Sequence, residues 1–294
     1  MRITAKKVRK LLIKLKGYNS KELPEVRTIN NLLNRLGYTL KRVQKIKPLK
    51  KIKETDAIFD NLKKINETAD LCSETLRISI DTKAKVNLGD FSRRGKKRSS
   101  VAPKAGDHDM NPLGKLVPFG ILEVQAGQLF TVVGASAETS DFIVDSLQIW
   151  WNERKENYVS VKKLVINLDN GPSGSSHRTQ FIKRITEFAE KNKIEIRLAY
   201  YPPYHSKYNP VERCWGVLEN YWNGDILDSV EKTLGMIKEM TWKGIKPIVH
   251  FLDKVFEKGI KLTKKEMKEY EEKIKRSKTL PKWDVVIDNG VLVL

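Results

Sequence analysis

The sequence contains only two cysteines and lacks a long apolar segment. Cys72 and Cys214 lie far apart and match neither a zinc-binding nor a disulfide spacing, so we expect free thiols in a reducing compartment. No apolar run approaches the roughly 18 residues that a membrane span requires, and the basic stretch after Met1 lacks the apolar core of a signal peptide. The sequence therefore predicts a cytoplasmic protein without a membrane partner.

Acidic residues are scarce in the first 53 residues. This segment holds 17 Lys and Arg but only Glu22 and Glu25 as acids, so it contributes +15 to a total formal charge of +20. It also lacks Trp and Phe, which favours a polyanion over a membrane surface as its partner. A solvated basic face, or a tail like those of ribosomal proteins, is the alternative interpretation.

Two helices are expected within this basic segment. Apolar residues recur at helical spacing over 5–16 and again over about 24–35, with a polar turn between the two runs. The pattern is typical of a helix-turn-helix, here an all-α module over residues 1–54. Its second helix would present four polar side chains to DNA: Arg27, Asn30, Asn31 and Arg35. A basic helical hairpin that contacts only phosphate or a protein partner fits the pattern equally well.

After a connector helix expected within residues 55–73, strands and helices alternate over 74–225. Strands are predicted at 75–83, 85–91, 116–125, 128–135, 162–169 and 193–201, and helices at about 139–154, 176–192 and 209–222. The order predicts an α/β fold in which helices flank both faces of a mixed sheet. We expect residues 226–294 to form a C-terminal helical extension.

Residues 93–115, between the second and third strands, are rich in Lys, Arg, Gly and Pro and contain few apolar residues. This composition predicts a mobile basic loop. Its first part supplies five candidate DNA contacts: Arg93, Arg94, Lys96, Lys97 and Arg98.

Three acids occupy positions that favour catalysis. Asp81 and Asp169 end strands, and Glu212 lies near the start of the helix that follows the last predicted strand, 193–201. Ionisable groups at strand ends of open α/β sheets lie where ligands bind. Converging carboxylates repel one another unless a cation neutralises them, and oxygen ligands select Mg²⁺ or Mn²⁺. Two such ions about 4 Å apart can activate a water or a 3′-hydroxyl for attack on a phosphodiester.

Each of these acids also has an ordinary structural explanation. An aspartate at a strand end is common as a turn former or a helix cap. Glu219 lies seven residues after Glu212 and on roughly the same helix face, so spacing alone does not choose between them. Pro210, suited to a first helical turn, favours Glu212, and Asn209 is expected to cap that helix.

The segments IDTK, NLDNGPSGSSHR and YPPYHSKYNPVER resemble the three acidic motifs of the DDE transposases of insertion sequences. The similarity is nearest to the Rhodopirellula-type transposases and extends from about Arg27 to the segment LPKWDVVI. It implies a ribonuclease H-like catalytic domain in which Asp81, Asp169 and Glu212 bind two metal ions and catalyse DNA strand cleavage and strand transfer. It also implies double-stranded DNA as the partner, both as element ends and as target, and a homodimer or larger synaptic complex in the nucleoid.

Three further residues are candidate DNA contacts. Lys83 follows Asp81 by two positions and would share its face of an extended chain, although a solvated strand-edge lysine fits as well. His205 and Lys207 precede the helix of Glu212.

Other functions also fit parts of the sequence. Family members usually have DNA-binding sequence upstream of the segment where this chain begins, so a non-catalytic DNA-binding regulator or a decayed transposase remnant is the main alternative. A ribonuclease or junction resolvase of the same fold is the second.

Overall fold

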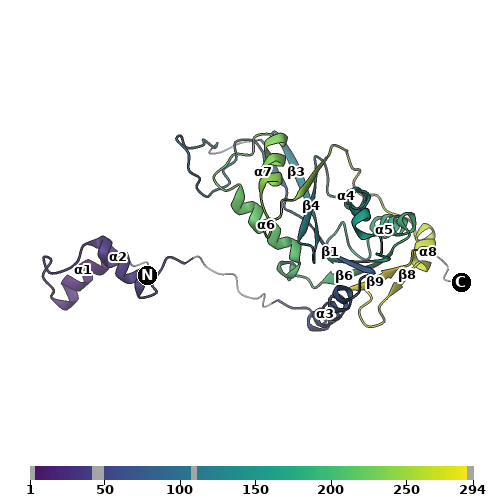
Figure 1. The fold of residues 1–294 in the computed structure, drawn as a ribbon, viewed down its shortest axis with the longest axis horizontal. Helices are drawn as coiled ribbons and strands as arrows, with labels where there is room; N and C mark the ends of the chain where they lie inside the picture. Colours follow the sequence, from purple (N-terminus) through teal and green to yellow (C-terminus); the bar gives the residue numbers. More distant parts are fainter. Residues whose placement is uncertain (1–3, 42–49, 107–110, 290–294) are drawn as a thin grey trace. The chain divides into compact units, whose positions relative to one another are not determined.

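The computed structural model describes residues 4–41, 50–106 and 111–289 of a chain that divides into two compact units. We call Met1–Lys47 the N-terminal unit and Pro48–Leu294 the main unit. Figure 1 shows the elements of both units. Residues 42–49, part of the predicted basic module, lie outside the described residues.

The N-terminal unit contains the two helices that the sequence predicts, α1 (Ala5–Lys16) and α2 (Val26–Arg35). The guanidinium of Arg9 donates to the carbonyls of Ser20 and Pro24, at 2.6 and 3.1 Å, and so ties α1 to the segment that leads into α2. This connection, residues 17–25, is longer than the turn of roughly three to four residues in a helix-turn-helix. The two helices are confirmed, and their assignment as a helix-turn-helix stays a prediction.

The main unit is built on one mixed sheet with the strand order β7-β4-β3-β1-β5-β6-β9-β8, and β2 pairs with β3 beside this path. The strands are β1 (Thr75–Thr82), β2 (Val86–Leu88), β3 (Gly114–Glu123), β4 (Gln128–Gly134), β5 (Lys163–Asp169), β6 (Glu195–Tyr201), β7 (Ile248–Leu252), β8 (Ile274–Arg276) and β9 (Asp284–Ile287). Strands β1, β5 and β6 run parallel, while β3 runs antiparallel to both β1 and β4. The predicted mixed sheet is confirmed.

Helices cover both faces of this sheet (Figure 1). They are α3 (Thr55–Leu71), α4 (Ser140–Arg154), α5 (Thr179–Asn192), α6 (Pro210–Tyr221), α7 (Val230–Glu239) and α8 (Lys264–Glu272), with short 3₁₀ turns at η1 (Lys155–Tyr158) and η2 (Ser206–Tyr208). Helices α4 and α5 pack on the face that carries Ile78 and Ile80 of β1. Alternate side chains of a strand point to opposite faces, so Ser79 and Asp81 face the side where α6 packs. Within the described residues, no helix combines the length and apolarity needed to cross a membrane.

The C-terminal segment differs in part from the prediction, because it contains three strands as well as helices α7 and α8. Residues 226–294 were expected to form a helical extension, but this segment adds β7, β8 and β9 to the sheet of the main unit. Strand β7 pairs with β4, and β9 pairs with β6. The apolar runs of β7 and β9 are too short for periodicity to distinguish a strand from a helix, so the sequence pattern could not resolve them.

Helix α3 also differs from a simple connector. Its apolar face, including Leu62 and Ile65, packs on Val165 of β5 and on Tyr201 of β6. This helix is therefore part of the main unit and supports the two strands that lead to the candidate site.

Candidate metal centre

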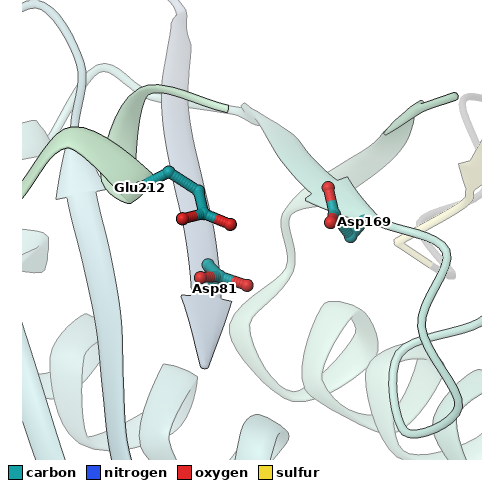
Figure 2. A group of neighbouring side chains, drawn as sticks. All are labelled: Asp81, Asp169 and Glu212. Carbon is teal, nitrogen blue, oxygen red and sulfur yellow. The ribbon is translucent and has the colours of Figure 1, made fainter. Parts of the chain in front are cut away.

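Three carboxylates converge at the ends of β1 and β5. Asp81 is the penultimate residue of β1, Asp169 is the last residue of β5, and Glu212 lies in the first turn of α6. One carboxylate oxygen from each residue lies within 4.8 Å of the other two. Figure 2 shows Asp81 beside Glu212, with Asp169 on the neighbouring strand. The structure brings the three predicted residues together, and their roles in metal binding and catalysis remain predictions.

The sheet places the two aspartates at the same edge. Strands β1 and β5 are parallel neighbours with Ser79 opposite Asn167, so Asp81 and Asp169 each follow two residues later. The chain then leaves the sheet after Asp169, which opens the space in front of both carboxylates. A rigid strand thus holds each aspartate from behind, as a preorganised site requires.

Buried polar contacts attach the start of α6 to β1. The Ser79 hydroxyl donates to Oδ1 of Asn209 and accepts from the backbone N–H of Val211 at 3.0 Å. The Asn209 amide donates to the carbonyl of Ile80 at 2.9 Å. Asn209 is the N-cap residue of α6, as predicted, but its side chain makes no capping hydrogen bond, because Ser79 supplies the oxygen that receives a free helix N–H. These contacts position Glu212 next to Asp81.

A tryptophan orients the first aspartate. The indole N–H of Trp215, one turn after Glu212, donates to Oδ2 of Asp81 at 2.9 Å. The indole lies over Gly120, the residue of β3 that pairs with Asp81. A Cβ atom at position 120 would lie 2.6 Å from the indole ring, so this glycine is required for the tryptophan to reach Asp81.

The close approach of the three carboxylates makes their ionised forms unfavourable. Burial, together with the charges of Glu212 and Asp169, raises the pKa of Asp81 to about 8, although the Trp215 hydrogen bond acts to lower it. Burial and the charge of Glu212 raise the pKa of Asp169 to about 6. None of the three forms an ion pair within the described residues, and the buried Oδ1 of Asp169 has no hydrogen-bond partner there. Both features favour a bound cation.

A small pocket of about 70 Å³ opens in front of Asp81 and Asp169. Glu138, in the segment between β4 and α4, lines it together with Gly171 and Ser173 of the loop after β5. Local sequence gives no sign of a role for Glu138, because an acid just before a helix is common wherever it offsets the helix dipole. The volume is sufficient for several waters or a hydrated ion.

Glu219, the competitor for the third position, lies in a different environment. Its carboxylate forms ion pairs with Lys83 and Arg93 and accepts from the indole of Trp222 at 2.8 Å. Burial acts to raise its pKa, but these hydrogen bonds and positive charges outweigh burial and lower it. Because Glu219 is already neutralised, Glu212 is the residue available to a metal ion.

The sequence matches a known family over nearly its whole length. The family described as "Rhodopirellula transposase DDE domain" matches residues 1–289. The chain belongs to this family. Its sheet β4-β3-β1-β5-β6, with helices on both faces, is the ribonuclease H-like fold that the resemblance implies. No curated protein matches the chain.

Solved structures with a similar fold include transposase and integrase chains. A mariner Mos1 paired-end complex with Mg has 11% identity and a TM-score of 0.47, covering 78% of this chain and 68% of that chain. A Mos1 transposase paired-end complex with the left transposon end has 12% identity and a TM-score of 0.44, covering 79% and 69%. The HTLV-2 integrase catalytic core domain in complex with magnesium has 15% identity and a TM-score of 0.33, covering 60% and 95%.

Three candidate DNA contacts near the acids, Lys83, His205 and Lys207, differ in their environments in this transposase-family chain. Lys83 is buried in its ion pair with Glu219 and is neither free for a phosphate nor solvated at a strand edge. His205 is also buried, with its ring against Phe59 and Tyr208, which leaves little surface for DNA. Lys207 is exposed, with its ammonium 5.4 Å from the centre of the Tyr208 ring.

The other candidate DNA contacts are mostly at the surface. On α2, all four are exposed: Arg27, Asn30, Asn31 and Arg35. In the loop after β2, Arg94, Lys96 and Arg98 are exposed, whereas Arg93 and Lys97 pair with acids. The described part of this loop contacts α6 and the segment that follows it, and the predicted mobility of the loop stays a prediction.

Proposed function

We propose that the chain catalyses metal-dependent DNA strand cleavage and strand transfer at the ends of an insertion sequence. The observation that carries this proposal is the set of three converging carboxylates, which form no ion pair with any of the described residues. Membership of the DDE transposase family supports the reaction class. An enzyme that acts on phosphodiesters needs this charge pattern, because bound cations offset both the carboxylates and the phosphate.

The residues of the site fit Mg²⁺ or Mn²⁺. All three donors are carboxylate oxygens, which suit these hard cations, and the unpartnered Oδ1 of Asp169 leaves one buried acceptor for an ion. When bound, such ions would supply the positive charge that favours activation of a water or 3′-hydroxyl and stabilisation of the leaving oxygen. Asp81, Asp169 and Glu212 would hold them.

The protein holds the three acids in fixed positions. Strands β1 and β5 fix the two aspartates, and the contacts of Ser79 and Asn209 fix the helix that carries Glu212. Trp215 restricts Asp81 to one orientation, which leaves its second oxygen for the pocket. Because the acids are held before substrate arrives, little reorganisation is required at the moment of reaction.

DNA binding is proposed for the basic surface of the chain. The net charge of +20 and the exposed polar residues of α2 suit a duplex, and the family suggests assembly of at least two chains on two DNA ends. Affinity should then fall steeply with salt, because bound cations are released from the phosphates.

Asp169→Asn tests the proposal directly. The variant should lose Mg²⁺-dependent cleavage of duplexes that carry the inverted repeats flanking the gene, while its DNA affinity is retained. Asp90→Asn, which changes an exposed loop acid in the same way, is the matched control and should cleave normally. Retained cleavage in Asp169→Asn would exclude the metal-site assignment.

The same assay separates the alternatives. A non-catalytic regulator would bind duplex DNA without cleaving it under any metal condition. A ribonuclease or junction resolvase would prefer an RNA–DNA hybrid or a four-way junction to the duplex. Each substrate is therefore compared with and without Mg²⁺.

A further inference from the structure

The cationic side chains of the basic run RRGKKR, residues 93–98, form two groups that differ in orientation. Arg93 and Lys97 turn inward, towards acids of the α6 end and of the segment that follows it: Arg93 pairs with Glu219, and Lys97 pairs with Asp225. We call these two residues the inward cations. Arg94, Lys96 and Arg98 are exposed and form no ion pair within the described residues. We call these three the outward cations.

Several independent contacts hold the loop in this arrangement. The guanidinium of Arg93 lies 4.7 Å from the ring centre of Trp222. The backbone N–H of Gly224 donates to the carbonyl of Arg94 at 2.7 Å, and that of Gly89 donates to the carbonyl of Leu227 at 2.8 Å. The loop is thus attached to the segment between α6 and α7 through backbone and side chains together.

Close backbone approach requires glycine on both sides of this contact. A Cβ atom on Gly95 would lie 2.5 Å from the side chain of Asn223, and one on Gly224 would lie 2.8 Å from the backbone nitrogen of Lys97. Both glycines also have positive φ, 76° and 81°. Arg94 itself has a φ of 62°, a backbone conformation that is unfavourable for arginine and that the surrounding contacts maintain. The backbone conformation at Arg94 is therefore fixed by the fold.

A pocket of about 390 Å³ lies between the loop and residues 224–226. Four cations line it: Arg93, Arg94, Lys96 and Lys97. Asp225 is the one acidic residue in its lining, and it is already paired with Lys97. The pocket therefore has a surplus of positive charge and suits a phosphate group.

The loop lies near the three catalytic candidates. Helix α6 carries Glu212 at its start and Glu219, the partner of Arg93, in its last turn. At 1.5 Å per residue, the seven residues from one glutamate to the other span about 10 Å along the helix.

We propose that the outward cations bind the phosphate backbone of double-stranded DNA beside the segment that lies at the acids, whereas the inward cations only dock the loop. This inference rests on the proposed function and specifies where the DNA runs. It divides one sequence run, RRGKKR, into a binding set and a structural set. Contacts of this kind position the duplex but do not distinguish sequences.

A matched pair of double variants of the full chain tests the division. Arg94→Gln with Lys96→Gln removes two outward charges, and Arg93→Gln with Lys97→Gln removes two inward charges of the same kinds. We measure duplex affinity at several salt concentrations together with the melting temperature. The outward double variant should weaken binding about tenfold at low salt, reduce the slope of log K against log salt by about 2, and melt like the parent chain. The loss should be equal for element-end and unrelated duplexes.

The inward double variant should instead lower the melting temperature, because it leaves Glu219 and Asp225 with fewer partners. The proposal is overturned if the outward double variant binds duplex like the parent chain at every salt concentration. It is also overturned if inorganic phosphate raises the melting temperature of the parent, and not of the outward variant, while duplex affinity is unchanged, since the pocket would then bind free phosphate.

These outcomes are distinguishable from failure of the proposed function. Duplex affinity is measured without metal and does not depend on cleavage. If the parent chain cleaves DNA but the outward double variant has the parental slope of log K against log salt, only the proposed role of the outward cations is contradicted. If the parent chain never cleaves DNA but the outward double variant has the smaller slope, only the proposed catalytic function is contradicted.

Discussion

The two ends of α6 repeat one sequence pattern. Glu212 and Trp215 near its start are matched seven residues later by Glu219 and Trp222. At each end the tryptophan donates its indole N–H to a carboxylate, that of Asp81 at the start and that of Glu219 at the end.

The two ends differ in charge compensation. At the end of the helix, Lys83 and Arg93 neutralise Glu219. At its start, Asp81 and Glu212 have no protein cation within the described residues. An acid that is paired with a cation costs the folded state little, whereas a buried acid without one destabilises it until a ligand brings the charge. The same four-residue pattern therefore serves structure at one end and, in our proposal, chemistry at the other.

The largest effect is expected from Glu212→Gln. It removes one of the three carboxylates and should reduce Mg²⁺-dependent DNA cleavage by on the order of 10³-fold or more, the range seen when one member of a catalytic unit is lost. Its melting temperature in the absence of metal should not fall, because the substitution reduces repulsion. Single-turnover cleavage and thermal melting measure the two quantities. A variant that cleaves at the parental rate would exclude Glu212 from the site.

Glu219→Gln makes the same chemical change at the other end of the helix and should behave oppositely. It leaves the buried ammonium of Lys83 without its carboxylate, which should lower the free energy of unfolding by about 2 kcal/mol. The value is below that of a fully buried pair because the Glu219 side chain is 42% exposed. Denaturant unfolding measures the loss. Unchanged stability would contradict a structural role for this ion pair.

The pH dependence of stability should reflect the acids beside the start of α6. The pKa of Asp81 in the folded metal-free chain, about 8, lies above its ordinary value of 3.8, so the folded state keeps a proton that the unfolded state loses. The free energy of unfolding should therefore fall as pH rises from about 4 to about 8. Asp169, whose pKa is raised to about 6, should act in the same direction between about pH 4 and pH 6.

Asp81→Asn provides the corresponding stability test. The variant should be more stable than the parent near pH 8 without metal, on the order of 2 kcal/mol, and should lose part of the pH dependence. Added Mg²⁺ should stabilise the parent at this pH but not the variant. Melting curves in the presence of a chelator and of Mg²⁺ measure both effects, and a parent whose stability rises over this pH range would contradict the electrostatic account.

The smallest effect is expected from Trp215→Phe. The variant keeps a large apolar side chain over Gly120 but lacks the donor to Asp81, so its Mg²⁺ requirement for cleavage should rise about tenfold. Trp222→Phe, which removes the donor to Glu219, is the matched control and should leave the Mg²⁺ requirement unchanged. Equal Mg²⁺ titrations for both variants would show that Trp215 has only a packing role.

Much of the main unit could be predicted from local sequence. The strands that end in Asp81 and Asp169 and the helix that starts at Pro210 follow from apolar runs and from residues that stop or begin an element. Short strands such as β9 could not be predicted, because four residues do not define a period and their pairing with β6 is a long-range contact.

The burial and the partners of each charged residue were harder to predict from the sequence. Lys83 and His205 belong to polar segments near the acids, which suggested contact with DNA, and the structure buries both. Their burial depends on Glu219 and Phe59, which lie far away in the sequence. Spacing carries no information about such partners.

The sequence by itself determined which residues approach the active edge of the sheet, since strand ends and helix starts are local properties of the chain. Tertiary structure alone decided which charges remain available there. Glu212 and Glu219 follow equivalent local rules, as do Arg94 and Arg93, but β1 and the loop after β2 bring cations to Glu219 and not to Glu212. The reason is physical: electrostatic compensation depends on distance in space and on burial, and both arise only when remote segments pack together.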